Sequence, residues 1–260
     1  MLDSVYHLPV LWMAVVIFTI VYLITWGIYA IVMAFARRGA KRVFTSVSTG
    51  MLSPLGTVFG LLVAFLAVQV WGDSRQANDA VDREASALRS VVLLSAGFPQ
   101  PTQEQVRSLV RRQIQESATH EWDAMAHRTA ALTTIPRPLA EALQLVLDQV
   151  PQSKGQTIAQ RETVRALEEA LDARRQRIIL SHSTINWIKW SGLAVEGLLT
   201  LLTIGMVHSD NRPAAFLAMV IFATAAAAAA VLIASHARPF TGEISERPDV
   251  LLQVLPEAGS

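Results

Sequence analysis

The stretch MLSPLGTVFGLLVAFLAVQVW, residues 51–71, decides the fold class because it carries no charged side chain along its whole length. A helix needs about 20 predominantly apolar residues to cross the hydrocarbon core of a bilayer. Three further stretches have a similar apolar character, at residues 8–36, 185–207 and 213–235. Four such helices are too many to bury inside a soluble protein of 260 residues. The sequence therefore predicts an all-α, multi-pass membrane protein with four transmembrane helices.

Composition excludes several other classes of protein. Hydrophobic residues make up 52% of the chain and charged residues 17%, against about 25% charged residues in average soluble proteins. The net charge of +1 gives no basic face for nucleic acid. The absence of cysteine excludes disulfides, thiolate catalysis and cysteine-bound zinc. Without a phosphate loop, a nucleophile elbow or a metalloprotease motif, we expect no enzyme, no cofactor and no metal.

A polar segment separates the second and third spans, at residues 73–183. After the second span, apolar and small residues continue at helical spacing through Ala77, Val81, Ala85, Leu88, Val92 and Ser95. We therefore expect the second span to leave the membrane as one long helix that breaks at residues 97–99. The predicted domains are transmembrane helices 1 and 2 (1–72), an extramembrane helical bundle (73–183), transmembrane helices 3 and 4 (184–236) and a tail (237–260).

The second half of the polar segment predicts another long helix. Apolar positions recur at helical spacing from Thr157 onward, with no proline or glycine before Trp190. We therefore expect this helix to run without interruption into the third span. Thr102 with Gln105 also predicts a capping box at the start of an earlier helix.

Positive charge does not by itself decide the orientation. We expect a loop between the first two spans, and it carries Arg37, Arg38, Lys41 and Arg42, which favours an external middle domain. Other basic residues flank the middle domain or follow the fourth span, and these favour a cytoplasmic middle domain: Arg75, Arg83, Arg174, Arg175, Arg177 and Arg238.

Two motifs resemble those of the bestrophins. Residues 53–61, SPLGTVFGL, resemble the second bestrophin span, where a glycine follows a proline by six residues in an apolar helix. Residues 238–243, RPFTGE, resemble the Asn-Pro-Phe-Gly stretch after the last bestrophin span. Over nearly its whole length the chain is also similar to a bacterial bestrophin-like family of unknown function, at residues 59–71, 121–126, 172–177 and 238–255.

This resemblance implies a pentameric anion channel, a homo-oligomer in a bacterial inner membrane, with chloride as the expected ion. The second span would line the pore, and the middle domain would be cytoplasmic. The bestrophin neck positions correspond here to Ser53, Thr57 and Leu61, which share one helix face. Only Leu61 is apolar as in the family, so a wetter constriction is expected. Alternatively, this stripe serves close helix packing, or the protein is a non-conducting membrane scaffold or signalling protein.

Glu196 is the second candidate feature because a carboxylate inside a span is costly, by about 2.5–3.5 kcal/mol on insertion scales. Lys189, Thr200 and Thr203 share its helix face. One interpretation is a proton-coupled membrane device. The other is a hydrogen bond from a protonated Glu196 to Gln69 on the second span.

Remaining charged groups favour plain roles. We expect Arg174, Arg175 and Arg177 to form a charged face paired with nearby carboxylates, with lipid head groups or anions as alternatives. The expected carboxylate partners are Glu168, Glu169 and Asp172. The acids after the fourth span, Glu243, Glu246 and Asp249, are too sparse for calcium and predict a solvated tail. His120, Asp123 and His127 lack a fourth metal ligand and predict an ordinary surface.

Overall fold

The computed structural model describes Tyr6 and residues 8–256, which form helices joined by turns, with no strand among these residues. The chain divides into two compact units. The membrane unit comprises residues 1–72 and 184–237, and the extramembrane unit comprises residues 73–183 and 238–260. One helix, α3 (Lys41–Leu94), contributes to both units.

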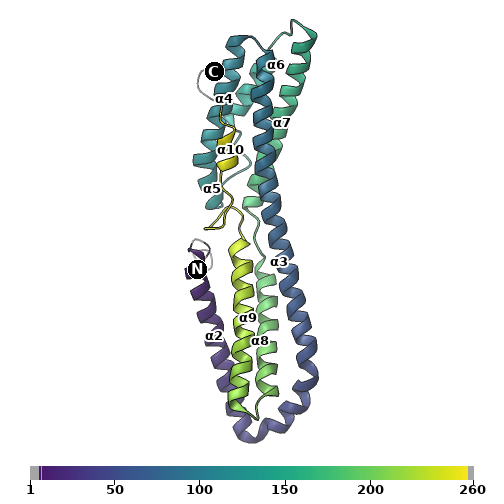
Figure 1. Cartoon of the computed structure of the whole chain (residues 1–260), viewed down its shortest axis with the longest axis vertical. Helices are drawn as coiled ribbons and strands as arrows, with labels where there is room; N and C mark the ends of the chain where they lie inside the picture. Colours follow the sequence, from purple (N-terminus) through teal and green to yellow (C-terminus); the bar gives the residue numbers. More distant parts are fainter. Residues whose placement is uncertain (1–5, 7, 257–260) are drawn as a thin grey trace. The chain divides into compact units, whose positions relative to one another are not determined.

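Among the described residues, four helices are long and apolar enough to span a membrane, as predicted, and their apolar parts belong to the membrane unit (Figure 1). They are α2 (Val10–Phe35), the first part of α3, α8 (Trp187–Val207) and α9 (Arg212–His236). Helix α9 packs against both α2 and α8. Small side chains permit this close approach, since Ala215, Ala223 and Ala227 are fully buried on α9.

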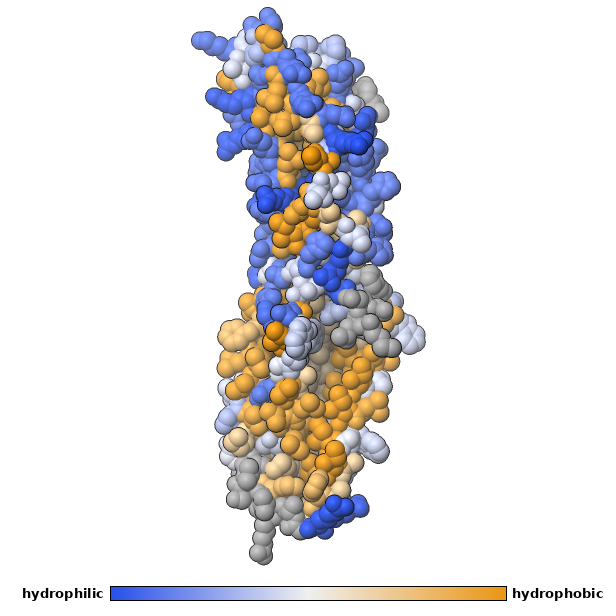
Figure 2. Space-filling model, turned by 180° about the vertical axis from the view of Figure 1, so that it is seen from behind, coloured by the Kyte–Doolittle hydropathy of each residue, from blue (hydrophilic) through white to orange (hydrophobic). Residues whose placement is uncertain are grey.

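On the face that Figure 2 shows, the surface of the membrane unit is mostly hydrophobic, whereas that of the extramembrane unit is mostly hydrophilic. Helix α3 is the least covered of the four spans. Only 6% of its most apolar window is buried, against 33% for α8. Its apolar surface therefore has to meet lipid or other protein chains.

The extramembrane unit is a helical bundle around an apolar core. Its helices are the second part of α3, α4 (Gln100–Glu116), α5 (Trp122–Ala126), α6 (Arg137–Leu147), α7 (Lys154–Ser181) and α10 (Asp249–Gln253), with a 3₁₀ turn at Ser95–Gly97 and a π-helical segment at Ser117–Glu121. Val81 and Leu88 of α3 are buried there, on the face that the helical spacing predicted. The predicted continuation of the second span is confirmed, because α3 runs to Leu94 and the 3₁₀ turn ends at Gly97.

Three local predictions are wrong. The segment expected to be a loop between the first two spans is a π-helical turn at Ala36–Ala40, and α3 already begins at Lys41 (the side chains of Lys41 and Arg42 lie outside the described part). The expected capping box is absent, since α4 begins at Gln100 after Pro99 and carries no side-chain cap. The Thr102 hydroxyl instead donates to Gln149.

The third error concerns the long helix before the third span. Helix α7 ends at Ser181 and α8 begins at Trp187, so the expected uninterrupted helix is broken at residues 182–186. Asn186 accepts a hydrogen bond from the Ile188 amide and thereby caps α8. Ser183 donates to the Asp73 carboxylate. The Asn186 bond is local, whereas the Ser183 bond reaches a residue 110 positions away in the chain. Side-chain bonds such as that of Asn186 compete with helix continuation, which a search for proline and glycine overlooks.

Candidate pore-lining helix and buried charge cluster

The three predicted pore residues lie on an exposed stripe of α3. Ser53, Thr57 and Leu61 follow one another at four-residue steps and are all exposed in the single chain, Leu61 by 52%. The opposite face of the same helix packs inward, where Leu66 and Val70 are buried. The stripe therefore points away from the body of the membrane unit.

Hydroxyl groups on this stripe are partly satisfied within the helix. The Thr57 hydroxyl donates to the Ser53 carbonyl at 3.0 Å. Pro54 lies inside α3 and has no N–H, so the Gly50 carbonyl lacks its usual helical partner. This part of α3 consequently presents polar oxygen atoms on an otherwise apolar helix.

The structure places Lys189 and Glu196 on α8, but it gives them different surroundings. The Lys189 ammonium donates to the Gln69 side-chain oxygen. Glu196 Oε1 is buried and has no hydrogen-bond partner among the described residues. The predicted bond between Glu196 and Gln69 is therefore wrong. The Thr200 hydroxyl does not bond to the Glu196 carboxylate, because it donates to the backbone carbonyl of Glu196.

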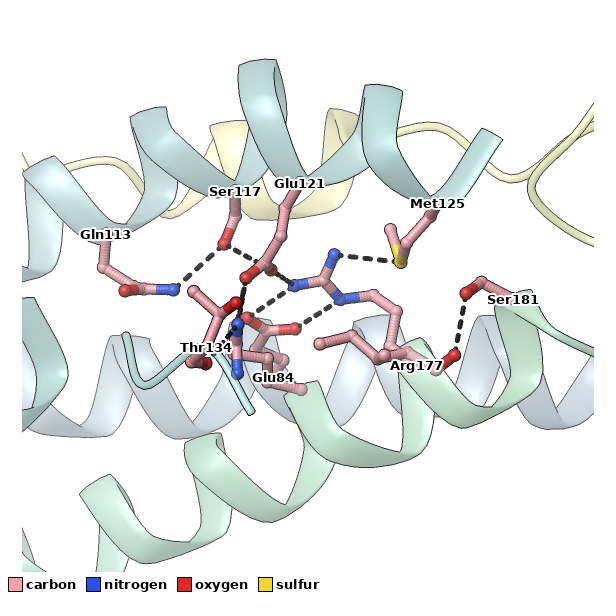
Figure 3. Close-up of polar contacts among 10 residues, drawn as sticks. Glu84, Gln113, Ser117, Glu121, Met125, Thr134, Arg177 and Ser181 are labelled. Atoms are coloured by element: carbon pink, nitrogen blue, oxygen red, sulfur yellow. Dashed lines mark hydrogen bonds and ion pairs between the residues drawn. The ribbon is translucent and has the colours of Figure 1, made fainter. Parts of the chain in front are cut away.

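A cluster of paired charges lies inside the extramembrane unit (Figure 3). Arg177 of α7 and Glu84 of α3 are both fully buried, and Nε of Arg177 lies 2.8 Å from Glu84 Oε2. A second nitrogen of Arg177 lies 2.8 Å from Glu121 Oε2. Arg174 completes the cluster, with its Nε 2.7 Å from Glu121 Oε1. These four residues, Glu84, Glu121, Arg174 and Arg177, are called the charge cluster below.

This pairing corrects the prediction for the arginines of α7. Arg174 and Arg177 are buried and pair with Glu121 and Glu84, not with the carboxylates of their own helix, so they do not meet lipid head groups either. Arg175 is exposed. The Arg177 guanidinium also lies 4.6 Å from the centre of the Trp122 ring, a cation–π distance.

The cluster shifts the pKa values of its members in ways that follow from its geometry. Burial opposes the ionisation of Glu121, but Arg177 and Arg174 outweigh it and lower the pKa of that carboxyl. Burial is the larger effect at Glu84 and raises its pKa, since Arg177 is shared and Glu121 repels a second negative charge. Burial opposes the positive charge of Arg177, but Glu84 and Glu121 outweigh the effect of burial and raise the pKa of the guanidinium, which therefore stays charged.

The tail after α9 packs against α5, next to the charge cluster. The Trp122 indole N–H donates to the Glu246 carbonyl, and the Trp122 ring meets Phe240 edge to face. The Thr241 hydroxyl donates to the Ala126 carbonyl. The segments 121–126, 172–177 and 238–255, which carried the family resemblance, thus meet in one place.

Two predictions about the tail and α5 are resolved by their contacts. The Glu246 carboxylate accepts a hydrogen bond from Asn78, and burial and the nearby Asp82 raise its pKa. The prediction of a freely solvated group is therefore wrong for Glu246. His127 pairs with Asp123 at the surface. No group of three metal-ligating side chains occurs in the part of the chain that the structure describes.

Sequence reasoning missed Glu84, although a signal was present. Glu84 lies beside Ala85, on the side of α3 that Val81 and Leu88 mark as apolar. A carboxylate on a predicted core face requires a buried cationic partner. The partner itself is 93 residues away, and only the fold brings it near.

A family model described as "Bestrophin-like domain" matches residues 19–251. Solved structures of a bacterial bestrophin homologue from Klebsiella pneumoniae have a similar fold. One single-residue variant has a TM-score of 0.71 at 11% identity, covering 90% of this chain and 95% of that chain. Another has a TM-score of 0.69 at 12% identity, covering 95% and 96%. A comparison with curated proteins gives no match.

Proposed function

Because this chain belongs to the bestrophin-like domain family, we propose that it is a homo-oligomeric ion channel whose path is lined by α3. The observation that carries the proposal is the exposed stripe of Ser53, Thr57 and Leu61. Around a shared axis, copies of this stripe would enclose a narrow path with two rings of hydroxyls and one ring of leucine. Such a constriction is wetter than an all-apolar gate.

The poor coverage of α3 supports assembly. Its apolar window is only 6% buried in one chain, and its exposed side carries both hydroxyls and large apolar groups such as Phe65 and Val68. Neighbouring copies would cover the apolar groups, while hydroxyl oxygens would face water in the path instead of lipid. From the family resemblance we propose five copies and chloride as the ion.

The same resemblance leads us to propose a bacterial inner-membrane location with the extramembrane unit in the cytoplasm. Arg75 and Arg83 are exposed on α3, which is compatible with this orientation under the positive-inside tendency. Attachment of a cysteine-reactive, membrane-impermeant label to Arg89→Cys in intact and opened cells tests it. Labelling only in opened cells is expected for a cytoplasmic unit. The label reports this site alone, since the natural chain has no cysteine. Labelling in intact cells would place this unit outside.

Ion flux from liposomes tests the channel itself. Purified protein would be reconstituted with chloride inside, and the external salt then exchanged for gluconate. We expect chloride-dependent flux in the natural protein and its loss in Thr57→Trp and Leu61→Trp, because an indole fills a narrow ring. Val58→Trp is the matched control, since Val58 is 45% exposed on α3 and lies off the stripe. Oligomeric size would be measured for each variant.

The Val58→Trp control shows whether a loss of flux is specific to the stripe. Flux retained in Val58→Trp and lost at both stripe positions would place the constriction on the stripe. Equal flux in all four proteins would remove α3 as the lining. An intact oligomer that conducts no ion would support a membrane scaffold instead.

A second candidate function rests on Glu196. Its Oε1 is buried without a partner, so a proton or a cation is the missing counterpart within the described residues. We infer from this a proton-coupled device as the alternative. Glu196→Gln would then abolish proton uptake into liposomes while the oligomer survives. Unchanged proton uptake in this variant would exclude the role.

A further inference from the structure

The extramembrane unit contains an open pocket of about 660 Å³, distinct from the α3 stripe. Its walls come from α4, the π-helical segment, residues 129–138, α6 and α7. Its volume lies in the range of small-molecule sites, about 300–1,000 Å³. Arg174 and Glu121 of the charge cluster form part of its lining.

Gln113 places an unused hydrogen-bond acceptor at this pocket. The Glu121 carboxylate accepts only, so the Ser117 hydroxyl must donate to it, at 3.3 Å. Ser117 then accepts from Gln113 Nε2, at 3.0 Å. This order of donors turns Gln113 Oε1 away from Ser117 (Figure 3). Gln113 is only 2% exposed, and its Oε1 has no partner among the described residues.

The backbone at the pocket is itself unusual. Ser117–Glu121 is π-helical between α4 and α5, a geometry that is rare and found often at functional sites. The wider turn carries Ser117, His120 and Glu121, all of which line the pocket. The unpaired buried acceptor next to a π-helical wall is what points to a ligand at this pocket, because a buried acceptor without a partner is costly.

The charges around the pocket are balanced. Three arginines and three glutamates line it: Arg112, Arg137, Arg174, Glu116, Glu121 and Glu141. Glu121 and Arg174 satisfy each other, and Arg112 lies 3.8 Å from Glu141. Arg137, at the rim, makes no ion pair with any residue that the structure describes, and it is exposed. Glu116 is likewise exposed at the rim. A ligand with one positive and one negative group matches this lining better than a purely anionic one.

We propose that this pocket binds a small zwitterion of the amino-acid class, whose carboxylate meets Arg137 and whose N–H group donates to Gln113 Oε1 once that buried side chain turns toward the pocket. Alanine, proline and isoleucine side chains, including Ala130 and Ile135, supply an apolar wall for the carbon skeleton. The proposal does not depend on ion conduction, since every group in it belongs to the extramembrane unit.

Binding to the purified full-length protein in detergent tests the site. The twenty standard amino acids would be screened at millimolar concentration by the shift in unfolding temperature, and titration calorimetry would follow for the strongest. At least one amino acid is expected to bind with one site per chain. The N,N,N-trimethyl derivative of that amino acid keeps both charges but has no ammonium N–H, so it is expected to bind at least about tenfold more weakly.

Variants then locate the binding. Arg137→Gln is expected to weaken binding about tenfold, with Arg89→Gln as an exposed control outside the pocket. Gln113→Met removes the acceptor, with Gln115→Met as an exposed control on the same helix. If Gln113→Met does not fold, Arg137→Gln and the trimethyl derivative still decide the outcome. No binding by any amino acid, or binding unchanged in Arg137→Gln and equal for the trimethyl derivative, overturns the proposal.

Discussion

The two units of this protein differ in whether their buried carboxylates have partners. In the extramembrane unit, three buried charges and the partly buried Glu121 lie together, and each has an opposite partner within hydrogen-bond distance. In the membrane unit, Glu196 is partly buried with one oxygen unpartnered. Paired burial is what a structural cluster requires. The Glu196 oxygen lacks such a pairing among the described residues, which is why a functional role is proposed for it above instead of a structural one.

Gly97 in the extramembrane unit and the glycines of the α3 stripe side differ in how tightly they are packed. A Cβ added at Gly97 in the extramembrane unit would lie 2.8 Å from the Ala159 Cβ. A Cβ added at Gly56 or Gly60 on the α3 stripe side would meet nothing within 4 Å. One unit is therefore close-packed within a single chain, whereas α3 in the other has room that lipid or a second copy would occupy.

The largest effect is expected from breaking the charge cluster. Arg177→Met leaves Glu84 buried without a cation and should lower the free energy of unfolding by about 3–5 kcal/mol. Arg175→Met is the matched control because Arg175 is exposed on the same helix, and it should change stability by less than about 0.5 kcal/mol. Thermal unfolding followed by tryptophan fluorescence measures both. Equal stability of the two variants would show that the cluster does not hold the bundle.

A smaller effect is expected from filling the space at Gly97. Gly97→Ala should destabilise the protein by about 1–3 kcal/mol, because the added methyl overlaps Ala159 and α7 must shift. Gly56→Ala should leave the unfolding temperature of the chain unchanged. If Gly56→Ala instead dissociates the oligomer on size-exclusion chromatography, a neighbouring copy packs at that point of α3. A neutral Gly97→Ala would contradict the close packing described for the extramembrane unit.

The pH dependence of stability sharpens the comparison further. The folded pKa of Glu121 is lowered below the ordinary value of 4.5, so its stabilisation is present above about pH 4.5 and is lost as the pH falls through the folded pKa. Glu121→Gln should therefore lose less stability than the natural protein between pH 5 and pH 3. Glu121 also helps to raise the Glu84 pKa, so the variant changes the contribution of Glu84 as well, and the difference between the two pH profiles reports the coupled pair. An identical pH profile for the two proteins would contradict the assigned direction.

The smallest effect on stability is expected at Glu196. Glu196→Gln removes an unpaired carboxylate from a span, so it should leave the unfolding temperature unchanged or raise it. Thr203→Val, on the same helix, provides a neutral comparison. A marked loss of stability in Glu196→Gln would mean that the carboxylate has a structural partner, and it would remove the contrast between the two units.

Much of the fold followed from local patterns. The four spans and the continuation of α3 to Leu94 were predictable because hydropathy and helical spacing act over neighbouring residues. The break at residues 182–186 was not predicted, since it carries no proline or glycine. It is accompanied by a local cap from Asn186 and by a bond from Ser183 to Asp73, 110 residues away, which only the fold brings near.

By itself, the sequence determined that this protein is a four-span helical membrane protein, because the cost of exposing apolar surface to water leaves no other fold class open. It also marked Ser53, Thr57, Leu61, Lys189 and Glu196 by their positions along the spans. Only the tertiary structure decided that Arg177 meets Glu84 and Glu121, that Lys189 takes Gln69, and that Gln113 is left with an open acceptor. Such pairings join residues on different helices, and their energies depend on distances that exist only once those helices have packed.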